Sequence, residues 1–446
     1  MSSMAKNAAR LAAQQTLGRL PRSSARLGPP LALEGGRPVR DTRLRPWKTA
    51  NSSTLMQWVT TVGPALKQVF LSGLEGLPQS RQKEFAQKWA RYCGCAHGLM
   101  LPHGTDALRF ALAAAFDHDG LEYGGEVIVP NLSFIASATA ALDRRFGVAF
   151  VDVDPGTLNI DPACVERAII PGKTRAIIPV HQFGQPADMD SLRDVARRHG
   201  LKIIEDAAQA HGARWKGDPV GCLGDAAAFS FQTSKNLACG EGGILTTNDS
   251  ALFDRAYSLH NAGRSPERES RWEHESLGWN CRPTEYQAAL LLHRFSSFEA
   301  EQATRLVNFS KLRELLGADD CVQALLDHPG VSRHGMYMFV LRYSPQRCGN
   351  VDVETFLRAL GAEGAPVYRC YAATMASQPA MKDLLARRPQ YVRLTQTPVS
   401  DKAVDEILYI PGYVFLGTVE DMEDIVAAIR KVQTHYRSRP GAPKGA

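Results

Sequence analysis

The chain has 446 residues, of which 44% are hydrophobic and 22% are charged, a composition typical of soluble globular proteins with a sizeable core and two or three domains. The formal net charge of +6 gives little support to nucleic-acid binding, because the basic excess lies at the two chain ends while the middle is nearly balanced. No run approaches the roughly 18 apolar residues of a membrane span. We therefore expect neither a nucleic-acid partner nor membrane insertion.

The two ends of the chain are predicted to lie outside the folded domains. Residues 1–28 are basic, rich in Ala and Ser, and contain no acidic residue. Such a segment is typical of a disordered extension in a bacterium or of an organellar targeting peptide in a eukaryote, and both readings stay open. Residues 437–446 are predicted to form a flexible tail. The nine cysteines are scattered and odd in number, which favours reduced thiols and a cytoplasmic location.

The first periodic segment runs from Glu84 to Phe116 and is predicted to be helical, with a break at residues 101–104. Its second half, TDALRFALAAAF, places apolar side chains at positions i, i+3, i+4 and i+7 behind Thr105. This pattern predicts an amphipathic helix that a polar residue opens.

Short apolar segments then alternate with helical ones. The predicted strands are residues 126–130, 148–154, 175–184, 201–207, 226–231 and 243–248, and the helices between them include residues 133–145 and 188–200. Apolar strands separated by helices predict an α/β fold with a mainly parallel sheet flanked by helices. Ligands bind at the carboxyl ends of such strands, which is where Glu205–Asp206, His181–Gln182 and Gln232 to Lys235 follow their strands.

The pattern of apolar and polar residues changes towards the C-terminus. Residues 334–343, 351–364 and 420–432 predict a smaller α/β domain that ends in a helix. We therefore predict a large domain over residues 29–305, with an N-terminal arm, and a small domain over residues 306–436.

Several common motifs are missing. GxxxxGK[ST] and a GxGxxG after a strand do not occur, so a nucleoside triphosphate or dinucleotide site is not supported. The absence of GxSxG disfavours an α/β-hydrolase. HExxH is absent, and His181 and His211 lack the spacing of metal ligands, so we expect no metal.

Three features could take part in a reaction: Lys235 after one strand, Asp206 at the end of another, and a His-Gly-Thr turn that opens a helix. The start of a helix binds phosphate, a carboxylate that faces a ring nitrogen keeps that nitrogen protonated, and a lysine amine can form a Schiff base with an aldehyde. Pyridoxal 5′-phosphate offers these three groups. From the residues alone, a solvated turn lysine stays an open alternative.

These residues also carry a family resemblance. The chain resembles the DegT/StrS-type sugar and cyclitol aminotransferases, which use pyridoxal phosphate and have the aspartate aminotransferase fold (fold type I). The matching motifs, in the family's order over residues 30–435 or so, are HGTDAL (103–108), GEVIVPNLSFIASATA (125–140), PVHQFGQPADMD (179–190), IIEDAAQAHGA (203–213), GDAAAFSFQTSKNLACGEGGILTTND (224–249) and NCRPTEYQAAL (280–290).

The resemblance implies catalytic roles for two residues. Lys235 would bond the cofactor covalently and shuttle a proton between the substrate carbon and the cofactor. Asp206 would pair with the protonated ring nitrogen and so keep the ring an electron sink. Gln209 would lie beside the phenolic oxygen of the cofactor.

The resemblance also implies how the rest of the cofactor is bound. Gly104, Thr105 and Ser230 would bind the phosphate. Phe134 would stack on the ring. Asn280 would contact the phosphate of the neighbouring subunit's cofactor, which implies a homodimer with shared active sites.

Each of these residues has an ordinary alternative role, as a helix cap, a core side chain, a turn hydroxyl or a loop amide. His211 is expected to be structural rather than a catalytic base, and for Glu241 the cap of a turn stays the alternative. The chain departs from many relatives at Gln232 and Pro283, which weakens any inference about the substrate. Lys235 is retained, whereas some relatives carry histidine there and remove a hydroxyl instead.

The predicted function is a ping-pong aminotransferase that moves an amino group from glutamate or glutamine to a keto-sugar or keto-cyclitol. Residues 28–40 and 363–371 resemble the branch that acts on keto-cyclitols. Two alternatives stay open: a sugar dehydratase that uses the same cofactor, and a cofactor-binding regulatory protein that has lost catalysis.

Overall fold

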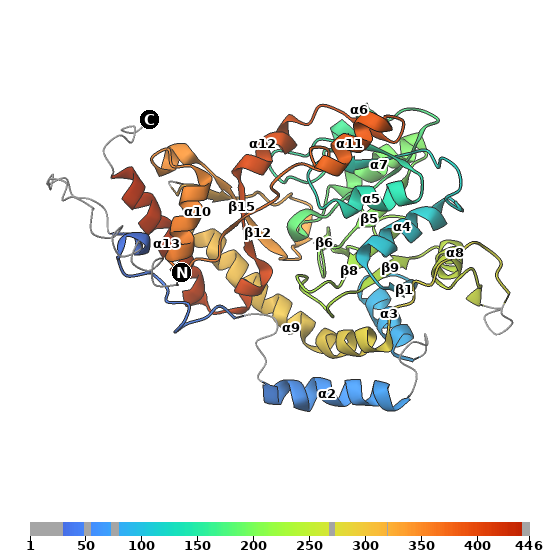
Figure 1. The fold of residues 1–446 in the computed structure, drawn as a ribbon, viewed down its shortest axis with the longest axis horizontal. Coiled ribbons are helices and arrows are strands. Elements are labelled where there is room, and N and C mark those ends of the chain that lie inside the picture. The colour runs from blue at the N-terminus through green and yellow to red at the C-terminus, as the bar shows by residue number, and fades with distance from the viewer. Residues whose placement is uncertain (1–29, 49–54, 73–79, 267–272, 319, 439–446) are drawn as a thin grey trace, which may run out of the picture.

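The structure is a computed structural model that describes residues 30–48, 55–72, 80–266, 273–318 and 320–438. It has two lobes, which the long helix α9 (Glu285–Leu315) connects (Figure 1). The predicted extension over residues 1–28 lies outside the described residues, as do residues 439–446 of the tail that was predicted from residue 437. Arg437 still belongs to the last helix. No helix in the described ranges is long and apolar enough to cross a membrane.

A mostly parallel sheet of eight strands forms the centre of the larger lobe. In spatial order the strands are β1 (His97–Leu101), β9 (Gly243–Thr247), β8 (Ala226–Ser230), β5 (Lys202–Asp206), β4 (Thr174–Ile177), β2 (Glu126–Pro130), β3 (Gly147–Val151) and β14 (Val392–Leu394). Every neighbouring pair from β8 to β14 is parallel, whereas β9 runs antiparallel to both β1 and β8. The predicted fold class, an α/β protein with a mainly parallel sheet, is confirmed.

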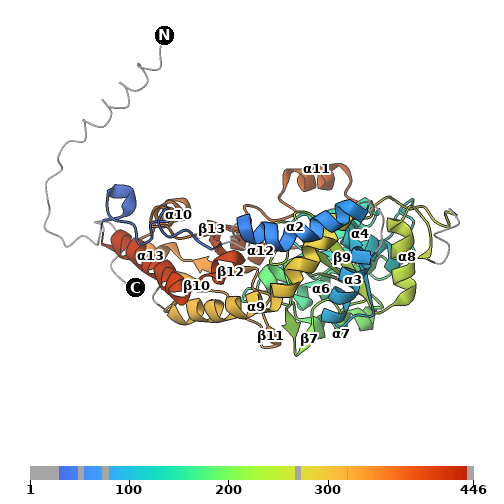
Figure 2. The same ribbon diagram turned by 90° about the horizontal axis from the view of Figure 1, so that it is seen from below.

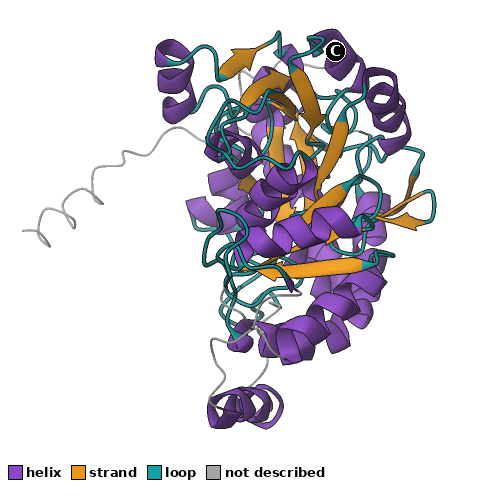
Figure 3. Cartoon of the chain, turned by 90° about the vertical axis from the view of Figure 1, so that its right-hand side faces the viewer, coloured by secondary structure: helices purple, strands orange, loops and turns teal. Residues whose placement is uncertain are grey.

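Helices cover both faces of this sheet (Figure 3). Along β2, Val127 and Val129 face a core shared with α4 (Gly104–Ala115), α5 (Ala136–Asp143) and α8 (Ser250–His260). Ile128 faces the opposite core, which contains side chains of α3 (Ser80–Tyr92), α6 (Pro162–Ala168) and α7 (Met189–His199). Because successive strand residues point to opposite faces, this double burial explains why the strands are apolar throughout.

One predicted helical segment was wrong. Residues 97–101 form strand β1 and pair with Gly243–Thr247 of β9, although residues 97–100 lie within the predicted helical run and residue 101 begins its predicted break. Helix α3 ends at Tyr92, and Gly94 follows in the left-handed conformation (φ +70°), which separates helix from strand. The sequence HGLML has three apolar residues at its end, and so short an apolar run fits a helix or a strand equally well, so only the pairing with β9 decides between them.

The smaller lobe contains a four-stranded sheet with helices packed on it. Its strands are, in spatial order, β10 (Val322–Ala324), β12 (Met338–Tyr343), β15 (Ile407–Pro411) and β13 (Tyr368–Arg369). Helices α10 (Val353–Ala362) and α13 (Val419–Arg437) bury Phe356, Ile425 and Ile429 against this sheet. Of the three segments from which the sequence predicted this lobe, the first two contain β12 and α10, and the third, residues 420–432, lies within α13.

Several elements link the lobes or lie at their edges. Helix α9 passes through residue 305, where the domain division is predicted, and α11 (Pro379–Arg387) leads into β14 of the larger sheet. The division at residue 305 stays a prediction. Figure 2 shows α2 (Leu55–Ser72) lying beside α9. The remaining short elements are η1 (Ala32–Glu34), η2 (Gln182–Gly184), η4 (Pro345–Cys348), η5 (Gly412–Leu416), α12 (Pro398–Glu406), and the small sheet of β11 (Val331–Arg333), β6 (Arg214–Trp215) and β7 (Asp218–Pro219).

Candidate active site

A cavity of about 570 Å³ lies at the carboxyl ends of β5 and β8, where ligands bind in parallel α/β sheets. The larger lobe supplies most of its wall, and the smaller lobe adds three side chains. The lining residues are His103, Gly104, Thr105, Asp106, Leu108, Ser133, Phe134, Ala136, Asp206, Ala208, Gln209, Ser230, Gln232, Ser234, Lys235, Glu241, Tyr337, Met338 and Tyr371. Seven of the eight predicted site residues are therefore in one cavity, and Asn280 is not.

Lys235 follows β8 in a tight turn, in which its N–H donates to the carbonyl of Gln232 at 2.8 Å. Its side chain is half-buried. Nζ lies 3.3 Å from the hydroxyl of Tyr337 and 4.4 Å from the centre of that ring. The lysine is thus not a freely solvated turn charge, since an aromatic ring and a hydroxyl from the other lobe hold its amine at the cavity.

Asp206 ends β5, and its carboxyl group is almost fully buried. Ser137 Oγ donates to Oδ2 at 2.6 Å, and the N–H of Ala208 donates to Oδ1 at 3.2 Å. Burial raises the pKa of Asp206 above its usual value, although these two hydrogen bonds and the charge of Lys235 oppose the change. A cationic group in the cavity would stabilise this buried carboxylate.

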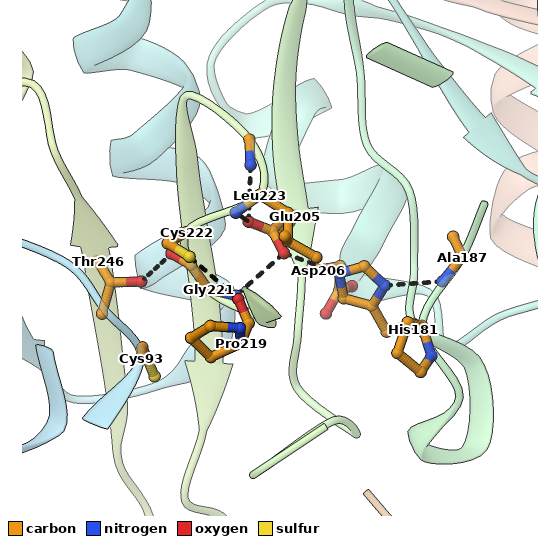
Figure 4. A network of polar contacts seen from close by, with 12 residues as sticks. Cys93, His181, Ala187, Glu205, Asp206, Pro219, Gly221, Cys222, Leu223 and Thr246 are labelled. Carbon is orange, nitrogen blue, oxygen red and sulfur yellow. Dashed lines mark hydrogen bonds and ion pairs between the residues drawn. The ribbon is translucent and has the colours of Figure 1, made fainter. Parts of the chain in front are cut away.

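The neighbouring Glu205 has a structural role, which Figure 4 shows. Its side chain is fully buried. Oε1 accepts hydrogen bonds from the N–H groups of Leu223 and Gly224 at 2.7 and 2.8 Å. Oε2 accepts hydrogen bonds from the N–H of Gly221 and from Nε2 of His181, both at 3.0 Å. His181 Nδ1 in turn accepts the N–H of Ala187 at 3.0 Å, so its proton is on Nε2. This network holds the carboxyl end of β5 and therefore supports Asp206.

Helix α4 opens at the cavity without a side-chain cap, because His103 at its N-cap makes no capping hydrogen bond. The first N–H groups of a helix have no partner inside the helix and favour an anion. The hydroxyls of Thr105 and Ser230 line the same part of the wall. A Cβ on Gly104 would lie 2.8 Å from Cβ of Ser230, so only glycine allows α4 to start this close to β8.

The other predicted contacts also face the cavity. Phe134 is 65% exposed although it is a large apolar side chain, which is unusual for a core residue. Gln209 is buried, and its Oε1 accepts the N–H of Phe183 at 2.7 Å while its Nε2 donates to the Tyr371 hydroxyl at 3.0 Å. These bonds assign the orientation of the amide and leave one N–H of Nε2 for a ligand.

The structure separates the remaining sequence candidates. Asn280 is exposed, is paired with Asn261, and accepts Nε of Arg282 at 3.0 Å. Of the two departures from the family pattern, Gln232 lines the cavity, whereas Pro283 does not and its carbonyl accepts from Gln82 at 2.7 Å. The position of Pro283 near the substrate therefore stays a prediction.

His211 lies outside the cavity, in an aromatic cluster with Trp89, Phe229 and Phe231. Neither ring nitrogen has a partner of ordinary hydrogen-bond geometry in the described chain. Burial lowers the pKa of His211 to about 3; the charge of Lys235 acts in the same direction and the backbone of Ser230 opposes it. The predicted structural role fits this position. Glu241 is exposed at the rim of the cavity.

Sequence reasoning did not identify three residues that contact or face the predicted site residues. Ser137 holds Asp206 from helix α5. Tyr337 and Tyr371 enter from the smaller lobe, about 100 residues or more after Lys235 in the chain. The SFIASATA motif could have pointed to Ser137, but no local pattern links the two tyrosines to the lysine.

The residues of the cavity fit pyridoxal phosphate in charge and chemistry. An uncapped helix start with two hydroxyls suits a phosphate, a buried carboxylate suits a protonated ring nitrogen, and an exposed phenyl ring suits a stacked aromatic ligand. Lys235 supplies the amine that an aldehyde requires. The described residues contain no group of three or more His, Cys, Asp or Glu side chains placed to hold a metal ion.

Comparisons with known proteins agree with this picture. The sequence profile of the DegT/DnrJ/EryC1/StrS aminotransferase family matches residues 65–430. The chain is 36% identical over 427 residues to L-glutamine:2-deoxy-scyllo-inosose aminotransferase of Streptomyces lividus, covering 91% of this chain and 98% of the relative. It is 36% identical over 375 residues to L-glutamine:scyllo-inosose aminotransferase of Streptomyces griseus, covering 80% and 87%. The crystal structure of 3-amino-5-hydroxybenzoic acid synthase matches with a TM-score of 0.74 at 29% identity, covering 86% of this chain and 99% of that one.

Proposed function

This chain belongs to the DegT/DnrJ/EryC1/StrS aminotransferase family, as its motifs predicted, and we propose that it moves an amino group from glutamine to a keto-cyclitol in two half-reactions. The observation that carries the proposal is that Lys235, Asp206 and the uncapped start of α4 meet in one cavity. The relatives from S. lividus and S. griseus, whose names give glutamine as donor and an inosose as acceptor, support both substrates.

Pyridoxal phosphate, when bound, supplies an aldehyde that bonds amines and a ring that withdraws electrons. Lys235 would hold it covalently between turnovers, and its freed Nζ would then move the proton on and off the reacting carbon of the substrate. Asp206 would hold a proton on the ring nitrogen through its buried carboxylate. Ser137 keeps this carboxylate in place through its 2.6 Å hydrogen bond.

The other residues of the cavity would bind and orient the cofactor. The start of α4, with the hydroxyls of Thr105 and Ser230, would bind the phosphate. Phe134 would cover one ring face, and the free N–H of Gln209 would donate to the phenolic oxygen. In each case the side chain already lines the cavity.

The charges of the cavity support an uncharged acceptor. Of the described residues that line it, none is an arginine, and only His103 and Lys235 can carry a positive charge, against Asp106, Asp206 and Glu241. A nucleotide-linked sugar carries a diphosphate, which proteins preferentially bind through arginine and lysine. The amide of Gln232 and the hydroxyls of Ser133 and Tyr371 suit the hydroxyl groups of a cyclitol.

We further infer a homodimer and a cytoplasmic location. Asn280 is exposed on its own chain, which fits the predicted contact with a partner's cofactor phosphate. All nine cysteines are free, as expected for a reducing compartment. Equilibrium sedimentation would test the dimer, and mixing the inactive variants Lys235→Ala and Asn280→Ala would test the sharing, since mixed dimers regain one intact site.

Isotope transfer tests the activity. The enzyme, loaded with pyridoxal phosphate, is given glutamine labelled with ¹⁵N at its α-amino group, and scyllo-inosose or a nucleotide-linked keto-sugar as acceptor. We expect ¹⁵N in an amine formed from the inosose, and none with Lys235→Ala. Loss of a hydroxyl without gain of nitrogen would establish the dehydratase instead, and cofactor binding without turnover of any acceptor would establish a non-catalytic protein.

A further inference from the structure

A turn from the smaller lobe brings a tyrosine against the reactive lysine. Tyr337 is 7% exposed and stands just before β12. Its hydroxyl lies 3.3 Å from Nζ of Lys235 and 3.2 Å from Oγ of Ser234, and Nζ lies 4.4 Å from the ring centre. The amine of Lys235 therefore has both a hydrogen-bond acceptor and an aromatic face within reach.

The backbone that presents Tyr337 has an uncommon conformation. Met336 has a φ of +55°, in the left-handed region that a residue with a long side chain rarely adopts. Such a conformation persists where the surroundings hold it firmly. The N–H of Met336 donates to Nδ1 of His334 at 2.8 Å, and the N–H of Gly335 donates to the carbonyl of Gly184 at 2.7 Å.

Asn236, the residue after the reactive lysine, holds the other side of this turn. It is 5% exposed. Its Nδ2 donates to the carbonyl of Gly335 at 2.8 Å and to that of Met336 at 3.1 Å, so both of its N–H groups are used. Two consecutive residues therefore have linked positions: Lys235 bears the reactive amine, and Asn236 binds the turn that presents Tyr337 to this amine.

We propose that Asn236 is a positioning residue that acts through Tyr337. Asn236 holds the Gly335–Met336 turn, and the Tyr337 hydroxyl then keeps Nζ of Lys235 facing the cavity whenever the amine is not bonded to the cofactor. This inference rests on the proposed function, in which the free amine must repeatedly find the same carbon. Lysine has four rotatable side-chain bonds, so an amine without this contact would spread over many rotamers.

Capture of pyridoxal phosphate by the cofactor-free protein tests the inference directly. In this step Nζ adds to the aldehyde carbon and one water leaves; borohydride then fixes the bond, and mass spectrometry of the Lys235 peptide measures its yield over time. We expect Tyr337→Phe and Asn236→Ala each to slow capture about tenfold, the effect of losing one hydrogen bond to a charged group. In the double variant capture should be no slower than in Tyr337→Phe, because the two residues act in series.

Asn308 offers a matched control. It is 3% exposed, and its Nδ2 donates to the carbonyls of Phe415 and Gly417 at 2.9 and 3.0 Å, the same pair of bonds made away from the cavity. Asn308→Ala should lower the unfolding free energy as Asn236→Ala does, yet capture the cofactor at the wild-type rate.

Two outcomes would overturn the inference. The first is an additive double variant, in which Asn236→Ala slows capture in the Tyr337→Phe background as much as in the wild type. The second is equal slowing by Asn308→Ala, which would make the loss of stability the cause. If wild-type protein failed to bond pyridoxal phosphate at Lys235 at all, the proposed function itself would be refuted instead.

Discussion

Replacing Gly104 with alanine should displace the start of α4 and weaken phosphate binding. The new Cβ would lie 2.8 Å from Cβ of Ser230, 3.2 Å from its Cα and 3.3 Å from the carbonyl oxygen of Phe229. Carbon atoms pack best at about 3.5–4.0 Å, so relief of the closest contact requires a shift of roughly 0.7–1.2 Å. Neither Cα of Ser230 nor the carbonyl can rotate away, because both belong to the backbone of β8.

The size of the effect follows from this shift. Overpacking of this kind costs about 1–3 kcal/mol of unfolding free energy. A hydrogen bond from a helix N–H to phosphate has a donor–acceptor distance of about 2.7–3.2 Å, so a shift near 1 Å breaks it. The loss of one hydrogen bond to a charged ligand costs about 1.5–3 kcal/mol, which corresponds to an affinity about 10- to 100-fold weaker.

The assay is a titration of the cofactor-free protein with pyridoxal phosphate, followed by tryptophan fluorescence, together with denaturant unfolding. Gly361→Ala is the matched control, since Gly361 lies in α10 and a Cβ there has open space. Its affinity for the cofactor should be unchanged. If Gly104→Ala folds and binds pyridoxal phosphate within twofold of the wild type, the start of α4 does not hold the phosphate.

Three further predictions concern buried ionisable groups. In the cofactor-free protein burial raises the pKa of Asp206, so the folded state loses stability as pH rises from about 4 through that pKa. The variant Asp206→Asn lacks this loss, so it should become more stable than the wild type as pH rises. It should also bind pyridoxal phosphate more weakly. His211 has a pKa lowered by burial to about 3, so the wild type should lose stability as pH falls below about 6.5, by about 2 kcal/mol at pH 5, and His211→Phe should remove this loss. Glu205→Gln would place an amide N–H₂ group against backbone N–H groups that now donate to the carboxylate. The free energy of unfolding should fall by about 1–3 kcal/mol for each N–H group left without an acceptor.

Urea unfolding at several pH values measures all three. The Asp206 argument fails if the Asn variant and the wild type show parallel stability curves between pH 4 and 7. The His211 argument fails if the Phe variant is as acid-sensitive as the wild type. For Glu205, the exposed Glu84, which pairs with Lys88 in α3, provides the control. Glu84→Gln should change stability by less than about 0.5 kcal/mol, and equal losses in the two variants would contradict the network.

The sequence by itself determined the architecture of the larger lobe and most of the cavity wall. Apolar strands that alternate with helices predict a parallel sheet, and the residues after each strand then share one edge. Asp206 after β5 and Lys235 after β8 meet for this reason, and Gly104 and Thr105 meet them at the start of α4. These positions can be predicted from the sequence because they follow from local patterns and from motifs in the family's order.

The tertiary structure alone decided what depends on distant parts of the chain. Residues 97–101 became strand β1 because β9 pairs with them, and β14 joins the large sheet although it comes from the C-terminal part of the chain. Tyr337 reaches Lys235 from a left-handed turn of the other lobe, to whose backbone carbonyl at Gly335 the side chain of Asn236 donates. Hydrophobic periodicity shows which face of a helix or strand is buried. The contact between Lys235 and Tyr337 depends instead on packing between segments about 100 residues apart, which no local sequence pattern encodes.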